Sequence, residues 1–167
     1  MLGVEKLTKS RSVRRRLRTL RCVVAAALWV LPAAASALVP SHEGLTVEQL
    51  KARISDAPVA DKARICVEIA EKQLVATDNL YAADDLANAQ PALTDVVTYS
   101  ELARDYSIQS HKHQKQIEIS VRTMTRKLHD LLHTLGQEDQ GPIKEAIGRL
   151  ERVRDDLLAS MFPKGAK

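Results

Sequence analysis

The spacing of apolar residues between Ile117 and Leu135 is the strongest structural signal in the chain. These residues follow one another in steps of four, three, four, three and four positions: Ile117, Val121, Met124, Leu128, Leu131 and Leu135. Steps of three and four place all six on one side of a helix, as in the seam where two helices pack lengthwise. The pattern therefore predicts a helix whose apolar side lies along another helix.

The same spacing extends from Ile117 back toward the N-terminus. The positions in phase with it are Gln114, Ser110, Ser107, Ala103, Ser100, Val96, Leu93, Ala89 and Leu86. Between Pro91 and Gly136 there is no Gly or Pro to end a helix. The favoured prediction is therefore one long central helix from near Asp84, its expected N-cap, to Leu135, with a kink or a slightly later start at Pro91.

A competing prediction comes from the middle of this long helix. Residues 107–116 are small and polar, and side chains such as Ser110 and Gln114 can cap a helix or form a turn. A break near Ser110–Gln114 would fold two helical hairpins together and bury more surface.

Three further helices follow from start and stop signals. Thr46 and Gln49 form a capping box flanked by Leu45 and Leu50, which predicts a helix over residues 47–56. Pro58 suits the first turn of a helix that ends near Ala82 and has two apolar stripes, so it should be central. Gly141-Pro142 starts the last helix, which ends at Phe162-Pro163. Its apolar stripe contains Ile143, Ile147, Leu150, Val153 and Leu157.

The chain contains no alternating apolar runs and no hairpin dipeptides, so no strand is expected. The predicted fold class is all-α, with antiparallel helical hairpins in an elongated helical bundle around a long central helix.

Charge separates the first 37 residues from the rest of the 167-residue chain. Residues 1–37 contain eight Lys or Arg and one Glu, and the remaining 17 basic and 20 acidic residues leave residues 38–167 with a net charge of −3. The net charge of +4 therefore resides in the leader, and the composition gives no general case for nucleic-acid binding.

The first 37 residues are typical of a secretory signal peptide. A basic region over Arg11–Arg21 precedes the short apolar stretch Cys22–Leu31, and Ala35-Ser36-Ala37 matches an A-x-A cleavage site. The expected mature product is a single helical domain over residues 38–167, periplasmic or secreted, with no stable membrane span. The alternative is an uncleaved anchor over Cys22–Val39, which is close to the lower length limit for a span.

Five residues stand out as candidates for thiol or metal chemistry. Cys66 is the single cysteine after cleavage and lies among apolar neighbours, so it is expected in the core. His129 and His133 have a metal-ligand spacing, but they fall on the solvent side of the predicted helix beside Arg126. His111 and His113 point apart on a helix and could chelate together only in a loop. We assign no metal site to either pair.

The charged side chains offer a further candidate surface and some carboxylate pairs. Lys112, Lys115, Arg122, Arg126 and Lys127 form a basic stretch that could be a solvated face or could contact an acidic partner, lipid headgroups or a cell-envelope polymer. The acidic pairs are Asp84-Asp85, Glu138-Asp139 and Asp155-Asp156. With no phosphate loop, nucleophile motif or Glu-x-x-His pair, we predict no enzymatic activity and no cofactor.

Three parts of the sequence resemble known groups of proteins. Leu45-Thr46-Val47-Glu48-Gln49 fits the LTxxQ signature and resembles periplasmic helical chaperones and metal-stress proteins of the Spy/CpxP type. Residues 63–93, with Leu80–Leu86 and Pro91-Ala92-Leu93, are similar to one tetratricopeptide-like hairpin. The mature region also resembles uncharacterised exported helical proteins of bacteria in Cys66–Glu71, Asp95–Tyr99 and Glu138–Gln140.

The sequence thus favours an exported helical interaction or structural module that binds a protein partner or itself through helix seams. The LTxxQ resemblance implies the alternative, a periplasmic helical chaperone or metal-binding stress protein.

The leader generates the first prediction, which is cleavage after Ala37. The small residues at Ala35 and Ala37 fit the signal-peptidase pocket, so the exported protein should begin at Leu38. Intact-mass measurement and N-terminal sequencing check this. A mature species that retains Cys22–Leu31 would instead identify the protein as membrane-anchored.

Overall fold

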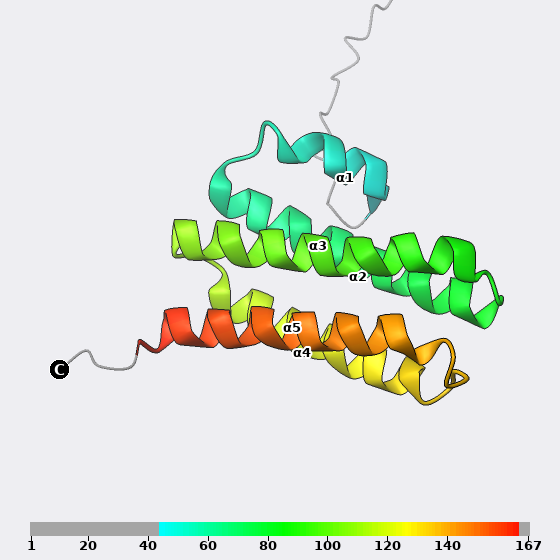
Figure 1. Cartoon of the computed structure of the whole chain (residues 1–167). Helices are drawn as coiled ribbons and strands as arrows, with labels where there is room; N and C mark the ends of the chain where they lie inside the picture. The colour runs from blue at the N-terminus through cyan, green and yellow to red at the C-terminus, as the bar shows by residue number, and fades with distance from the viewer. Residues whose placement is uncertain (1–43, 164–167) are drawn as a thin grey trace, which may run out of the picture. The chain divides into compact units, whose positions relative to one another are not determined.

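The structure, a computed structural model, describes residues 44–163 and contains five helices and no strand in that range. The helices are α1 (Val47–Ile54), α2 (Val59–Ala82), α3 (Leu86–Ser110), α4 (Gln114–Leu132) and α5 (Gln140–Met161) (Figure 1). The predicted all-α class is confirmed, while the predicted signal peptide lies outside the described residues.

The four long helices form two antiparallel hairpins, α2–α3 and α4–α5, stacked on each other (Figure 1). α3 packs on α5 and α2 packs on α4, whereas α2 and α5 have no close backbone approach. Glu101 pairs with Arg149 and Arg104 pairs with Asp156, so α3 and α5 run in the same direction. The short link from α3 to α4 therefore crosses the diagonal of a four-helix ring.

α1 begins with the predicted capping box. The Gln49 backbone N–H donates to Thr46 Oγ1 at 3.3 Å, and the Thr46 backbone N–H donates to Gln49 Oε1 at 3.0 Å. The helix ends at Ile54, two residues before the predicted end at Asp56. Leu50 is fully buried, and it anchors α1 on the outer side of α2.

α2 occupies the central position that its two apolar stripes predict. Ile65 and Ile69 on one side pack with Leu50 of α1. On the other side, Ala63, Cys66, Val67, Ala70 and Leu74 belong to the core shared by α2, α3, α4 and α5. α2 therefore has buried residues on two sides and places its charged residues between them.

The predicted cap of α3 is wrong by one residue. Asp84 adopts a left-handed conformation at φ 58°, and Asp85 is the N-cap that accepts a hydrogen bond from the Asn88 backbone N–H at 3.3 Å. Pro91 lies inside the helix and does not delay its start. The missing N–H at Pro91 costs one helical hydrogen bond, which the flanking packing of Ala89, Ala92 and Leu93 offsets.

The favoured long central helix is wrong, and the alternative break near Ser110–Gln114 is confirmed. α3 ends at Ser110, and His111 and His113 both adopt left-handed conformations, at φ 55° and φ 63°. The break lets α5 pack on α3 and α4 on α2. The two hairpins therefore share one core, where a continuous helix would leave each hairpin with a small core of its own. The free energy of burying that core exceeds the cost of two strained residues.

The in-phase seam survives the break. The buried positions of α3 include Ala89, Leu93, Val96, Ser100, Ala103 and Ser107, and those of α4 include Ile117, Val121, Met124, Leu128 and Leu131. α4 ends at Leu132, three residues before the prediction, and the Gln140 side-chain amide caps it by donating to the Leu132 and Leu135 carbonyls. The predicted stripe of α5 is buried as expected.

The burial of Leu128 and Leu150 predicts that Leu128→Ala and Leu150→Ala each lower the free energy of unfolding by about 2–4 kcal/mol. Both side chains are fully buried on neighbouring antiparallel helices, so truncation leaves a cavity. His129→Ala, next to Leu128 but exposed, should change it by less than about 0.5 kcal/mol. Denaturant unfolding curves measure all three, and a large loss at His129 without one at Leu128 would contradict the assignment.

Candidate functional site

Within residues 44–163, Cys66 and the histidines lie apart from one another, in the core, in a turn and on the outer side of α4. Cys66 is fully buried in the core, and burial raises the pKa of its thiol to about 12 despite the opposing effect of Lys62. His111 and His113 lie in the turn between α3 and α4, as the alternative prediction required. In this range no three His, Cys, Asp or Glu side chains are placed to hold a metal ion.

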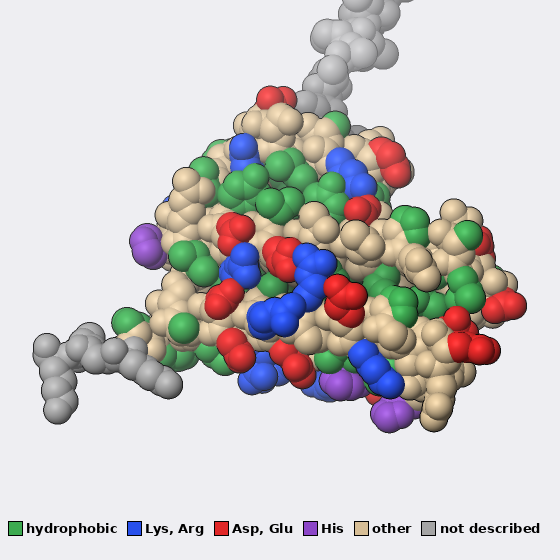
Figure 2. Space-filling view, viewed as in Figure 1, with side chains coloured by type: hydrophobic (Ala, Val, Ile, Leu, Met, Phe, Trp, Pro, Cys, Tyr) green, Lys and Arg blue, Asp and Glu red, His purple; other side chains and the backbone are tan. Residues whose placement is uncertain are grey.

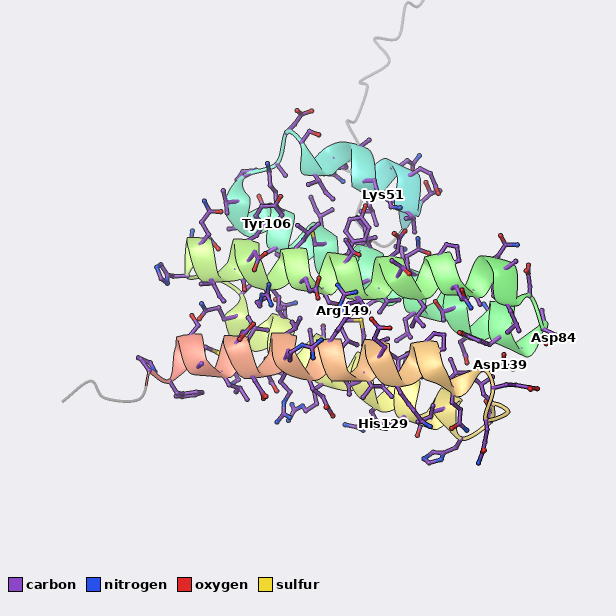
Figure 3. All side chains as sticks on the ribbon, in the orientation of Figure 1. Lys51, Asp84, Tyr106, His129, Asp139 and Arg149 are labelled. Atoms are coloured by element: carbon purple, nitrogen blue, oxygen red, sulfur yellow. The ribbon has the colours of Figure 1, made fainter. Side chains whose placement is uncertain are left out.

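His129 and His133 lie on the solvent side of α4, as the helical phase predicts. Both are exposed, and in Figure 3 His129 points away from the bundle. Two imidazoles one turn apart supply only two ligands, and Arg126 is the next residue on the same side. They form part of a larger basic surface instead.

We call this surface the α4 basic stripe. It consists of Lys115, Arg122, Arg126, His129 and His133, all exposed on the side of α4 opposite its buried seam. The positions differ by seven, four, three and four residues, which keeps them on one side of the helix. Ile119, whose side chain is 42% exposed, is the apolar residue of this stripe.

Most charges of the stripe have no internal partner. Arg122 lies 3.8 Å from Glu118 through its Nε atom and is still 52% exposed. Lys115 and Arg126, like the neighbouring Lys112 and Lys127, make no side-chain hydrogen bond or ion pair within the described range. For these four side chains, no acid within the described range competes with an external partner.

The rest of the domain has the opposite charge. Residues 44–163 contain 15 basic and 19 acidic side chains. Residues 112–133 account for five of the basic and two of the acidic side chains, a net charge of +3, which leaves −7 for the remainder. The α4 basic stripe is therefore a local positive strip on an acidic body.

Basic residues at the helix contacts, by contrast, are already neutralised. Arg149 donates to both oxygens of Glu101, at 3.0 and 2.7 Å, and this hydrogen bonding raises the pKa of Arg149. Arg104 donates to Asp156 at 2.8 Å. In Figure 2 the blue and red side chains alternate on the face formed by α3 and α5, so this face presents little net charge to a partner.

Sequence reasoning missed the polar residues that connect helices. Glu118 lies on the edge of the core, 8% exposed, and accepts a hydrogen bond from Arg154 of α5 at 3.1 Å. Asp95 of α3 accepts from Lys51 at 2.8 Å and from Gln73 at 2.7 Å, and this bonding raises the pKa of Lys51. No local pattern marks these pairs, because each joins residues 22 to 44 positions apart.

The acidic pairs of the sequence lie at turns or at helix contacts. Asp85 caps α3, and Asp156 accepts from Arg104. Asp84 and Asp139 lie at the same end of the bundle, in the two hairpin turns (Figure 3). Asp139, together with burial as the larger cause, raises the pKa of Tyr81. This acidic end lies opposite the end that contains Lys112.

Two grooves follow the contact between α2 and α4. The first, of about 330 Å³, is lined by polar and charged residues that include Asp61, Glu71 and Gln116. The second has the same volume and is more apolar, with Leu74, Val75 and Leu131 in its lining. Both are open depressions between helices.

The residues of the LTxxQ match have structural roles at the start of α1. Thr46 and Gln49 are both used in the capping box, and Leu45 packs beside Leu50. The tetratricopeptide-like stretch forms the α2–α3 hairpin, with Tyr81 buried near the turn. Neither observation tests the resemblances, which stay predictions.

Comparison with protein-family models, curated proteins and solved structures finds no match for this chain. Within the described residues, no helix is both long enough and apolar enough to span a membrane. The geometry and charge of the surface are therefore what points to a function.

Burial of Cys66 predicts slow thiol reactivity and a loss of stability in alkali. The thiol pKa rises from 9.0 to about 12 on folding, so above pH 9 the unfolded state loses a proton that the folded state keeps. The stabilising contribution is present below pH 9 and should be lost as the pH rises toward 12. Thiol labelling at pH 8 should be slow in the folded protein and fast in denaturant. Unfolding curves of Cys66→Ala should not show the loss of stability that the thiol causes between pH 9 and 12.

Proposed function

We propose that this protein is an exported helical interaction module that binds an acidic protein partner through the α4 basic stripe. One observation supports the proposal above all others: a row of exposed basic side chains on α4, of which only Arg122 has an ion pair within the described residues, on a domain whose remaining charge is −7. A folded protein gains nothing in stability from such a row, because like charges one turn apart repel.

The shape of the stripe favours a narrow acidic partner. It follows one convex helix from Lys115 to His133, about 27 Å at 1.5 Å per residue. A flat anionic surface such as a bilayer would also meet the acidic remainder of the domain and be repelled by it. An acidic helix or extended segment can contact the stripe alone, and Ile119 offers an apolar contact between Lys115 and Arg122.

The first 37 residues support the part of the proposal that concerns export. The basic region, the apolar stretch and Ala35-Ser36-Ala37 support delivery to the periplasm or the exterior, where the expected partner would be an envelope protein.

Photo-crosslinking in intact cells tests the proposed surface. A photoreactive amino acid replaces Ile119 in the stripe or, as the matched control, Val75 on α2, which is 54% exposed. We expect one dominant protein adduct at position 119 that weakens as ionic strength rises, since salt screens exposed charges. Equal adducts at both positions, or an adduct confined to position 75, would place the partner outside the stripe.

Charge reversal supplies the second arm of this test. Arg122→Glu/Arg126→Glu should abolish the adduct at position 119, because it changes four units of charge within the stripe. The control Arg53→Glu/Arg152→Glu makes the same change at two exposed arginines outside it and should leave the adduct intact. An adduct that survives the first variant would contradict recognition by charge.

A further inference from the structure

The turn between α3 and α4 is the most strained segment among the described residues. Asp84, His111 and His113 are the three residues other than Gly with positive φ in that range, and two of them flank Lys112 in this one turn. L-residues with a Cβ atom adopt the left-handed conformation at a cost, and no Gly relieves it here. The turn is also short, since only three residues separate Ser110 from Gln114.

The helical seam remains in phase across this turn. Ser107, Ser110, Gln114 and Ile117 continue the three- and four-residue steps that run from Leu86 to Leu131. If residues 111–113 became helical, α3 and α4 would form one helix of about 70 Å with its apolar positions on one side. The seam at the turn is polar, so straightening it exposes no large apolar side chain there.

Straightening the turn separates the two hairpins. The core between them includes Val96 and Ala103 of α3 and Leu150 and Val153 of α5, all fully buried. The ion pairs Glu101–Arg149 and Arg104–Asp156 also join the hairpins. A single opened chain would lose these contacts, but a second opened chain presents the same surfaces in the same arrangement.

From this geometry we infer that the protein forms a domain-swapped dimer through the His111–His113 hinge. In this dimer, the α4–α5 hairpin of each copy packs on the α2–α3 hairpin of the other. Each contact between hairpins is then remade between chains, and the left-handed strain at His111 and His113 is released in both. A short strained hinge is the condition under which exchange competes with closure. The inference does not depend on the proposed function.

Hinge variants with opposite backbone preferences test the inference. Gly adopts positive φ without strain, so His111→Gly/His113→Gly should favour the closed monomer. Ala favours the helix and resists positive φ, so His111→Ala/His113→Ala should lower the dimer dissociation constant by roughly tenfold or more relative to the Gly variant. Each variant, as the full-length chain, is unfolded and then refolded slowly at high protein concentration. Light scattering then measures its dimer dissociation constant. An Ala variant no more dimeric than the Gly variant overturns the inference.

Cross-chain trapping identifies the swap itself and leaves the hinge unchanged. One chain has Glu101→Cys and another Arg149→Cys, both in a background of Cys22→Ser and Cys66→Ala. After co-refolding, a short bis-maleimide can join these two positions at the helix contact only if α5 of one chain packs on α3 of the other. We expect a covalent heterodimer after co-refolding and none after mixing of separately refolded chains. A single chain with both Cys substitutions is the positive control, because it shows whether the bis-maleimide can span the distance between positions 101 and 149.

A negative result is equally clear. If the single-chain control is cross-linked within itself and the co-refolded pair gives no heterodimer at any concentration, then the hairpins do not exchange and the inference is wrong. A dimer that forms by light scattering but is not trapped would be an ordinary surface association, which also overturns it.

Discussion

The packing of α3 against its neighbours is the contact on which the rest of the bundle depends. α3 contacts α2, α4 and α5, and many of its buried positions are small, including Ala89, Ser100, Ala103 and Ser107. Small side chains let neighbouring helices approach closely, and the buried serines stay satisfied because Ser100 and Ser107 donate to carbonyls of their own helix. Large residues at these positions would separate the two hairpins and open the core.

This arrangement determines where charge can be used. Basic residues at the contacts of α3 and α5, Arg104 and Arg149, are paired with carboxylates across the helix interface. The outer side of α4 is exposed, and its cations make no ion pair with an acid of another helix among the described residues. The difference between a neutral face and a basic stripe therefore follows from which helix sides meet, since each sequence segment alone contains charges of both signs.

Much of the fold could be predicted from local pattern. The capping box at Thr46 and Gln49, the two stripes of α2 and the seams of α3, α4 and α5 are all confirmed, because caps and periodicity act within one or two helical turns. The exposed position of His129 and His133 followed from the same phase. The helical phase therefore predicts which side of α4 has the basic stripe. It does not predict whether acidic side chains of other helices lie opposite that side.

Local patterns were enough to predict the helical segments, their buried sides and the core position of Cys66, since each depends on neighbours along the chain. The turn at His111–His113 depends instead on packing between distant segments. A polar, in-phase segment is compatible with both a long helix and a turn, and the choice rests on the core gained when α5 meets α3. The same holds for the pairs Glu118–Arg154 and Lys51–Asp95. Helix packing brings the two partners together, and no spacing in the sequence predicts the contact.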